Sequence, residues 1–285
     1  METLIHEMFP HIGDESELAN ALEHRGEKYL DRYMYYRTYR AGVADGTIKL
    51  PILPIIGAMP CLGKTSIGAD LARRLGILQM VGADGLRAVF RELIDKEAHP
   101  YFFTSVYGAW KFAGDGTETE ENVAKGFRLQ ANVMNDLMQR WVADRGIRDG
   151  ESAILEFLHL LPTRFLPEIL EHPSVIPIVL RIDDMDLYKN RIASRVTSTH
   201  LKGGANRLIE VADKYLQMQE IQCADAEKAG IPVILVDDWN SAMDQILTIV
   251  FEAIGKINEL KDVETDSRLL DRIKAERSLN PGEGK

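Results

Sequence analysis

Cysteine is scarce in this chain of 285 residues. Its two cysteines, Cys61 and Cys223, lie far apart in the sequence and lack the spacing of metal ligands. This scarcity argues against a disulfide framework and against a metal site built on cysteine. We therefore expect two reduced thiols, as in a cytoplasmic protein.

Long apolar runs are missing as well. No run approaches the roughly 18 apolar residues that would span a membrane. The first residues, METLIHEMFPHIGDESE, contain early acidic residues and no apolar core of the signal-peptide type. These two absences predict a protein of the cytoplasm without membrane contact.

Positive charge is in deficit. The chain has 34 lysines and arginines against 44 aspartates and glutamates, a formal net charge of −10. This balance argues against a uniform nucleic-acid-binding surface, although a local basic groove would still be compatible with it. Internal repeats and low-complexity tracts are absent from the sequence too.

Short apolar segments alternate with helical patterns along the middle of the chain. Helices are predicted from apolar residues three to four positions apart, as for Ile67, Leu71 and Leu75. The alternation predicts an α/β fold with a five-stranded, mostly parallel sheet that helices cover on both faces. The expected strands are 48–58, 77–84, 152–160, 175–183 and 231–238, and the expected helices are 64–76, 85–97, 120–145, 185–197, 207–229 and 239–260.

Two flanking regions frame this α/β domain, which we expect to span residues 51–260. The charged and tyrosine-rich residues 1–50 are predicted to form a helical extension, which is a candidate interface of a homodimer. Residues 261–285 are charged and are predicted to be a solvated helix that frays into disorder. The chemistry is therefore expected in the central domain.

The stretch IIGAMPCLGKTS, residues 55–66, joins the first strand to a helix. It approaches the phosphate-loop (Walker A) pattern G-x-x-x-x-G-K-[ST]: Gly63, Lys64 and Thr65 fit its end, but Ala58 replaces the first glycine. A GKT tripeptide that opens a helix by chance is the competing interpretation. The strand before the stretch and the amphipathic helix after it favour a working loop.

Such a loop binds phosphate through its backbone. Amide groups of the loop and of the helix N-terminus surround the anion. Lys64 would reach the outer phosphates of ATP, and the Thr65 hydroxyl would bind Mg²⁺. Gly57 can relieve crowding at the strand exit in place of a glycine at position 58. The residues expected to contact the nucleotide are Gly57, Ala58, Met59, Pro60, Cys61, Leu62, Gly63, Lys64, Thr65 and Ser66.

A second motif, GADGLR, follows the second strand. Asp84 would lie at the carboxyl end of that strand, where ligands bind in open parallel sheets, and Arg87 on the same side of the first helical turn. The pair suits an acceptor with a hydroxyl and an anionic group, because the carboxylate can orient or deprotonate the hydroxyl and the guanidinium can hold the anion. Alternatively, Asp84 caps the helix and Arg87 is a solvated surface charge.

Together with later segments, these motifs resemble the P-loop kinases of the 2-phosphoglycerate kinase family. The resemblance implies a three-layer P-loop kinase fold and Mg²⁺-dependent transfer of the ATP γ-phosphate to 2-phosphoglycerate, which gives 2,3-bisphosphoglycerate. Ala58 and Cys61 depart from the family by replacing loop glycines, and Phe157 stands where the family has glycine. The matching segments follow the family's order over roughly residues 52–240: GAMPCLGKTSIGADLARRLGI, GADGLRAVFREL, SVYGAWKF, GFRLQANVM, ILEFLHLLP and ADKYLQMQEIQ.

The third strand contributes two further candidates. Glu156 falls near its end, where the carboxylate could bind Mg²⁺ through water or contact the acceptor. A buried acid at a strand end needs a partner, which a metal ion or an arginine would supply. His159 stands where the strand leaves the sheet and is a candidate acceptor ligand, although a lone histidine among apolar residues is commonly a packed structural residue.

Arginines follow the fourth strand. Arg191 and Arg195 are four residues apart on one expected helix, and a polar stretch with Lys202 follows. We therefore expect residues 190–210 to form a lid that excludes water and stabilises the transferred phosphoryl group. Arg195 is the first candidate for that stabilisation, with Arg191 beside it as a nucleotide ligand. An ordinary pair of amphipathic helices with solvated charges is the alternative.

Residues 98–145 are expected to form a helical insertion over the acceptor side. Its aromatic segment YFFTSVYGAWKF is better explained by packing than by stacking on a base. Tyr107 within it is a candidate contact of the acceptor.

The sequence as a whole predicts a small-molecule kinase that uses ATP and Mg²⁺. Two rivals stay open. One is a P-loop kinase that acts on a nucleotide or nucleic-acid hydroxyl, against which the net charge of −10 argues. The other is an ATP-binding regulator without catalysis, which Ala58 and Cys61 favour and the retained Lys64 and Asp84 oppose.

Overall fold

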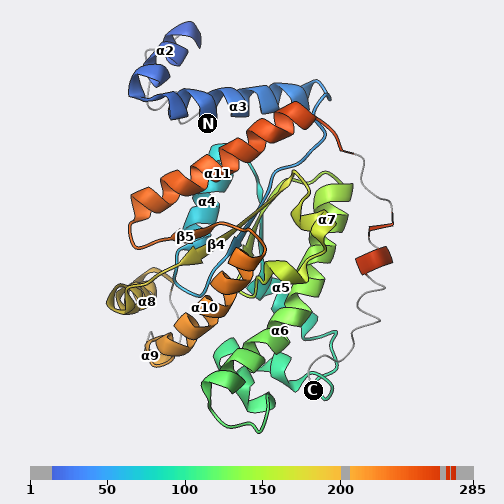
Figure 1. The fold of residues 1–285 in the computed structure, drawn as a ribbon, viewed down its shortest axis with the longest axis vertical. Helices are drawn as coiled ribbons and strands as arrows, with labels where there is room; N and C mark the ends of the chain where they lie inside the picture. Colours follow the sequence, from blue (N-terminus) through green and yellow to red (C-terminus); the bar gives the residue numbers. More distant parts are fainter. Residues whose placement is uncertain (1–14, 200–205, 264–267, 270, 274–285) are drawn as a thin grey trace.

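Five strands form one sheet in the order β2-β3-β1-β4-β5, and every neighbouring pair is parallel (Figure 1). The predicted five-stranded sheet is confirmed. The computed structural model describes residues 15–199, 206–263, 268–269 and 271–273. The strands are β1 (Leu53–Gly57), β2 (Gln79–Gly82), β3 (Ala153–Phe157), β4 (Val175–Arg181) and β5 (Val233–Leu235).

Strand β1 lies at the centre of the sheet, between β3 and β4. All five of its residues are buried, which accounts for its continuous apolar sequence. Its last residues, Ile56 and Gly57, pair with Glu156 and Phe157 of β3. This register brings the start of the loop that follows β1 next to the Glu156 carboxylate.

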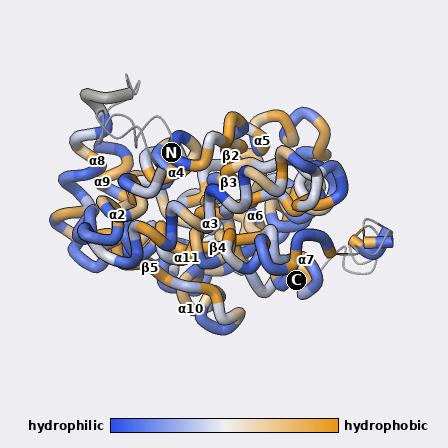
Figure 2. Tube along the Cα trace, turned by 90° about the horizontal axis from the view of Figure 1, so that it is seen from above, coloured by the Kyte–Doolittle hydropathy of each residue, from blue (hydrophilic) through white to orange (hydrophobic). Residues whose placement is uncertain are grey.

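Helices cover both faces of the sheet, which gives the expected three layers (Figure 1). On one face, α4 (Lys64–Leu75) and α11 (Trp239–Leu260) pack against Ile56 and Ile178. The opposite face carries Ile55 and Val179 and is covered by α6 (Glu120–Trp141), α7 (Pro167–Leu170) and α10 (Ala212–Lys228). Figure 2 shows hydrophilic and hydrophobic stretches alternating along the outer helices, as expected for helices that bury one side.

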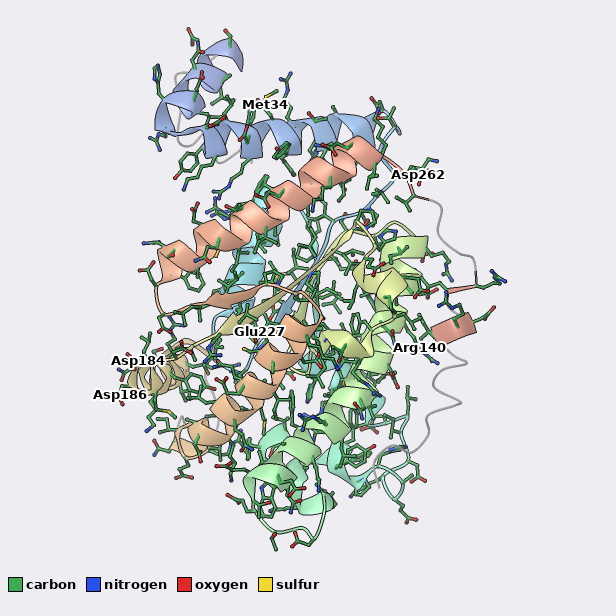
Figure 3. All side chains as sticks on the ribbon, in the orientation of Figure 1. Met34, Arg140, Asp184, Asp186, Glu227 and Asp262 are labelled. Atoms are coloured by element: carbon green, nitrogen blue, oxygen red, sulfur yellow. The ribbon has the colours of Figure 1, made fainter. Side chains whose placement is uncertain are left out.

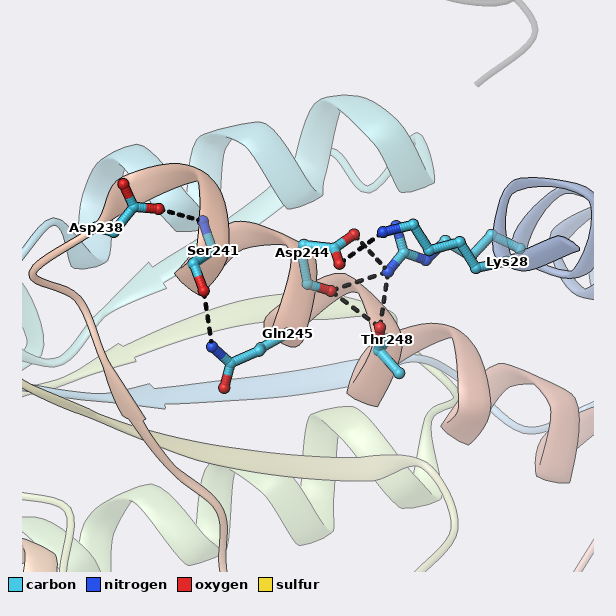
Figure 4. Close-up of polar contacts among 7 residues, drawn as sticks. Lys28, Asp238, Ser241, Asp244, Gln245 and Thr248 are labelled. Carbon is cyan, nitrogen blue, oxygen red and sulfur yellow. Dashed lines mark hydrogen bonds and ion pairs between the residues drawn. The ribbon is translucent and has the colours of Figure 1, made fainter. Parts of the chain in front are cut away.

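The N-terminal helices α2 (Glu15–Arg25) and α3 (Glu27–Ala44) lie outside α11 (Figure 1). The Nζ atom of Lys28 is 2.8 Å from the Asp244 carboxylate. Arg32 donates hydrogen bonds to the Asp244 carbonyl at 2.9 Å and to the Thr248 hydroxyl at 2.7 Å (Figure 4). Tyr36 donates from its hydroxyl to the Leu75 carbonyl at 2.6 Å. The extension is thus fastened to both helices of one layer.

The helix after β2 differs from its predicted range. It was expected at residues 85–97, whereas α5 spans Ala83–Phe90. The chain turns instead at residues 91–99, where the Asp95 carboxylate accepts a hydrogen bond from the Glu97 amide. Pro100 then opens a 3₁₀ helix, because its ring fixes φ and it has no N–H to donate.

The predicted insertion at residues 98–145 contains several elements. Two 3₁₀ helices, η1 (Pro100–Phe103) and η2 (Val106–Phe112), precede α6, and a π-helical turn η3 (Val142–Arg148) follows it. The Thr119 hydroxyl accepts a hydrogen bond from the Asn122 amide and caps the start of α6.

The segment after β4 begins with α8 (Met185–Thr199). The Asp184 carboxylate, visible in Figure 3, accepts hydrogen bonds from the amides of Asp186 and Leu187 and so fixes the start of this helix. The predicted helix 207–229 is divided into α9 (Asn206–Ile209) and α10. Residues 200–205 of the predicted lid, with Lys202, lie outside the described residues.

The tail differs from the expected solvated helix in the few residues that are described there. Leu269 and Ile273 are buried and belong to the same apolar cluster as Ile169 of α7. Arg272 forms an ion pair with Glu168 at 2.5 Å. In the described parts of the chain, no helix combines the length and the apolar character needed to cross a membrane.

Candidate active site

The loop between β1 and α4 needs glycine at two positions. Gly63 has φ of 96°, in the left-handed region, and a Cβ there would lie 2.8 Å from a ring carbon of Trp239. A Cβ on Gly57 would lie 2.7 Å from Leu160. Ala58 is fully buried and has no positive φ, so alanine meets the local requirement at this position. The shifted first glycine is therefore compatible with the shape of the loop.

Cys61 is the strained residue of this loop. Its φ is 64°, a conformation that costs a non-glycine residue about 1–3 kcal/mol. We expect Cys61→Gly to raise the free energy of unfolding by about 1 kcal/mol and the Tm by about 2–4 °C. Thermal unfolding without nucleotide measures this effect. Cys223→Gly, which removes a buried side chain from α10, should lower Tm, and an unchanged Tm for Cys61→Gly would contradict the strain argument.

Thr65 and Glu156 meet at the start of α4. The Thr65 hydroxyl donates a hydrogen bond to Oε2 of Glu156 at 2.7 Å. Register with β1 and β2 fixes the backbone position of Glu156, which pairs with both Ile56 and Gly82. The two side chains offer adjacent hard oxygen atoms, which is the donor type that Mg²⁺ prefers. In the described residues no group of three His, Cys, Asp or Glu side chains could hold a metal ion, but Mg²⁺ sites commonly combine few protein oxygens with substrate phosphates.

Lys64 lies among charged groups at the same loop. Its side chain is half-buried, and desolvation lowers the pKa of its ammonium group. Asp84 and Glu156 oppose this shift, whereas Arg195 adds to it. Residues from the loop, from β3, from α5 and from α8 are thus within electrostatic range of one ammonium group.

Asp84 lies in the first turn of α5 and is exposed. The helix N-cap is Gly82, and no side chain caps it by a hydrogen bond. In the part of the chain that the structure describes, the Asp84 carboxylate has neither a hydrogen bond nor an ion pair. The hydrogen-bonding cap considered from the sequence is therefore absent, and this carboxylate is available to a ligand.

Arg87 is a half-buried cation held by backbone carbonyls rather than a solvated surface charge. Its Nη2 donates to the carbonyl of Phe102 at 3.2 Å and to that of Thr104. Its guanidinium carbon lies 5.5 Å from the centre of the Phe102 ring. Desolvation and the neighbouring Arg91 lower its pKa to about 10, and Asp84 opposes this shift. Arg87 therefore stays protonated near pH 7.

Two arginines of α8 contact different parts of the protein. Arg195 Nη1 lies 3.7 Å from the Sγ of Cys61, in the phosphate loop. Arg191 Nη2 donates to the Val236 carbonyl, just after β5, at 2.5 Å. Arg195 is the arginine that the structure places at the loop, while Arg191 ties α8 to the sheet.

Comparison with known proteins gives relatives over most of the chain. No protein-family model matches the sequence. A 2-phosphoglycerate kinase of Methanocaldococcus jannaschii is 30% identical over 225 residues, which cover 77% of this chain and 69% of the relative. A 2-phosphoglycerate kinase of Methanopyrus kandleri is 28% identical over 239 residues, or 84% of this chain and 71% of the relative.

The chain belongs to the 2-phosphoglycerate kinase family. The resemblance predicted from its motifs is confirmed, and the protein is a P-loop kinase, an ATP-dependent phosphotransferase with a small-molecule substrate. A mevalonate-3-phosphate 5-kinase of Thermoplasma acidophilum is also similar, with 31% identity over 67% of this chain and 92% of the relative. A shikimate kinase structure from Bacteroides thetaiotaomicron gives 15% identity over 70% of this chain and 97% of that chain, but its TM-score of 0.36 adds nothing to the assignment.

His159 lies behind the site of this kinase and not on its surface. Its ring is fully buried, stacks on Phe127 at 6.1 Å between ring centres, and has Nε2 3.2 Å from Oε1 of Gln130. Burial lowers its pKa well below the ordinary value, so the ring is neutral near pH 7. The sequence left two interpretations of His159 open, an acceptor ligand and a packed structural residue, and the buried ring agrees with the second because it has no exposed surface.

Tyr107 packs on a tyrosine that sequence analysis did not single out. Its ring meets Tyr215 of α10 edge to face, at 5.9 Å between centres. Tyr215 is buried, and burial raises the pKa of its hydroxyl. Asp84 and Arg87 lie within its electrostatic range. The tyrosine pair thus lies on the side of the kinase where the GADGLR motif lies.

Trp239 is a second residue that sequence analysis missed. It is the first residue of α11, contacts the place where a Gly63 side chain would be, and is 39% exposed. An aromatic residue just after the last parallel strand was the available signal, because ligands bind at the carboxyl ends of such strands.

Proposed function

We propose that this kinase transfers the γ-phosphate of ATP to a hydroxyl of a small acceptor that also carries a phosphate or carboxylate. The first candidate is 2-phosphoglycerate, which would become 2,3-bisphosphoglycerate. The observation that carries the proposal is the pair Asp84 and Arg87, an uncommitted carboxylate and a half-buried guanidinium on one helical turn beside Lys64. An acceptor that carries both a hydroxyl and an anionic group requires a carboxylate and a guanidinium close together, and Asp84 and Arg87 supply them.

The proposed roles follow from charge and position. Loop amides and Lys64 hold the phosphates of ATP, and Thr65 with Glu156 would hold Mg²⁺, which supplies charge neutralisation to the phosphates when bound. Asp84 accepts the proton of the acceptor hydroxyl as the hydroxyl oxygen attacks the γ-phosphorus of ATP. ADP leaves with the bridging oxygen. Arg195, next to Cys61 in the loop, stabilises the charge on the moving phosphoryl group.

The lid is part of the same proposal. Helix α8 carries Arg195 and, with α9, would close over the bound nucleotide. Closure would exclude water, which competes with the acceptor for the phosphoryl group. The bond from Arg191 to the Val236 carbonyl would give the base of the lid a fixed support.

Trp239 is proposed to stack on the base of ATP. Base–aromatic stacking contributes about 1–3 kcal/mol, so Trp239→Ala should raise the Kd for ATP about tenfold. Tripolyphosphate, which has no base, should bind equally well to both proteins. Calorimetric titration measures both constants, and a parallel loss of tripolyphosphate affinity would show that Trp239 only shapes the loop at Gly63.

The names of the relatives set the choice of acceptors to test. Two kinases act, by their names, on 2-phosphoglycerate and on mevalonate 3-phosphate. The experiment measures ADP release from Mg·ATP with both compounds and with a panel of phosphorylated and carboxylated hydroxy acids. An Asp84→Asn variant runs beside the native protein, because loss of turnover in this variant would assign the activity to this protein and not to a contaminating kinase.

Turnover with one member of the panel would name the acceptor. ATP binding without turnover would overturn the small-acceptor proposal and favour one of the rivals, a polymer-acceptor kinase or a regulator. Single-stranded DNA and RNA would then be tried as acceptors. A steep loss of DNA or RNA binding with added salt would support a kinase that acts on a nucleic acid.

A further inference from the structure

The carbonyl oxygen of Thr104 collects three side-chain donors. Arg87 donates to it from Nη2, Arg91 from Nη2 at 3.1 Å, and Gln130 from Nε2 at 3.3 Å. Thr104 lies between η1 and η2, far in sequence from α6, which carries Gln130. One backbone oxygen thus connects the helix of the acceptor motif with the insertion that borders it.

The two arginines share a second oxygen as well. The Phe102 carbonyl accepts hydrogen bonds from Arg87 Nη2 at 3.2 Å and from Arg91 Nε at 2.9 Å. The arginines are four positions apart, with Arg87 in α5 and Arg91 as its C-cap residue, so their guanidinium groups lie on one side of this helix and its end. Two like charges are held together without a carboxylate between them, and the proximity of Arg91 lowers the pKa of Arg87.

Each guanidinium keeps donors that the protein does not use. In the described part of the chain, neither Nη1 of Arg87 nor Nη1 of Arg91 donates a hydrogen bond, and Nε of Arg87 is buried without a partner. A cation pair with free donors attracts an anion, and a dianion most strongly. A phosphate group, with three acceptor oxygens and up to two charges, matches two guanidinium groups better than a carboxylate does.

Gln130 is fixed from behind by His159. Besides Thr104, its Nε2 donates to the Tyr101 carbonyl at 2.5 Å, so its Oε1 is the atom that faces Nε2 of His159 at 3.2 Å. A neutral histidine must then carry its proton on Nε2. Both Gln130 and His159 have no exposed surface. The amide therefore has one orientation, with its two donors aimed at the η1–η2 backbone.

We infer that Arg87 and Arg91 form a paired site for a phosphate group of the acceptor, and that Gln130, oriented by His159, is the positioning residue that fixes the Thr104 carbonyl on which the pair is assembled. The inference rests on the proposed function for the identity of its ligand. The inference adds Arg91 to the site as a second cation. The paired site selects phosphorylated acceptors over those with a carboxylate alone.

The first experiment separates positioning from folding. Gln130→Met removes both amide contacts at similar volume, and Gln139→Met makes the same change in the same helix. Gln139 is also buried, but its Oε1 accepts its hydrogen bond from the Leu166 amide. We expect Gln130→Met to raise the KM for 2-phosphoglycerate about tenfold while the KM for ATP is unchanged. Gln139→Met should lower Tm without changing either KM, and equal KM values in the two variants would overturn the positioning role.

The second experiment does not depend on turnover. With the nucleotide site filled by a non-hydrolysable ATP analogue and Mg²⁺, inorganic phosphate and D-glycerate are titrated calorimetrically. The native protein should bind phosphate. Arg91→Gln should weaken phosphate binding at least tenfold without changing the binding of D-glycerate. Arg91→Lys, which keeps the charge but not the fork of donors, should recover part of the loss.

These outcomes distinguish the inference from the proposed function. If 2-phosphoglycerate is not turned over but Arg91→Gln and Gln130→Met still weaken phosphate binding, the paired site stands and the proposed acceptor falls. If the native protein binds phosphate no better than Arg91→Gln does, the paired site is wrong, whichever acceptor the kinase uses.

Discussion

Arg195→Gln is expected to lower kcat by about three orders of magnitude or more. Arginines that stabilise the charge of a transferred phosphoryl group contribute about 10³–10⁵ to kcat. Arg195 lies 3.7 Å from Cys61 in the phosphate loop and within electrostatic range of Lys64, so its charge is placed where that group would move. The KM for ATP should change much less, because the loop amides and Lys64 remain.

Steady-state ADP release with the acceptor identified from the panel measures this effect. Lys189→Gln is the matched control, since it also removes one positive charge from α8 at an exposed position. Arg195→Lys should restore a small part of the rate, because an ammonium group keeps the charge without the fork of donors. A loss below tenfold for Arg195→Gln would remove Arg195 from the chemical step.

Asp84→Asn should produce the second large loss, about 10²–10⁴ in kcat. General base catalysis contributes this much, and the amide cannot accept a proton at neutral pH. The substitution keeps the size of the side chain at an exposed site where the carboxylate makes no hydrogen bond or ion pair within the described residues. Stability should therefore be nearly unchanged, which separates this variant from a folding defect.

Binding measurements sharpen the second prediction. ADP affinity should be equal in the native protein and in Asp84→Asn, while turnover is lost. Asp31→Asn, at an exposed position of α3, is the control for removing one carboxylate. Retained turnover in Asp84→Asn would mean that the acceptor hydroxyl reacts without this base, and Glu156 would be the next carboxylate to test.

The central strand of the sheet could be predicted from the sequence because it is a continuous apolar run. In a parallel sheet buried on both faces, strand β1 (Leu53–Gly57) contains no polar residue that would interrupt its apolar sequence. Helix α11 was predicted with its observed limits, since Asp238 caps its start with a hydrogen bond from the Ser241 amide at 2.7 Å (Figure 4). Local signals were sufficient for these elements.

The site was predicted only in part. The loop, Glu156 and the GADGLR motif could be placed because each lies at or just after the end of a recognisable strand. The partners of Arg87 could not, because the carbonyls of Phe102 and Thr104 approach it only through the tertiary position of the insertion. The same holds for Trp239, whose contact with Gly63 joins segments about as distant as the chain allows within the domain.

The docking of α11 has a consequence for the order in which the chain folds during synthesis. This helix carries Trp239 at one end, against the phosphate loop, and receives Lys28 and Arg32 of α3 along its length. Both contacts join earlier residues to a segment that leaves the ribosome only after strands β1 to β5. A nascent chain that lacks α11 therefore has neither the Trp239 contact at the loop nor a partner for Lys28 and Arg32 of α3. We expect such a chain to bind ATP only after α11 has been synthesised, because this one helix completes the packing at both places.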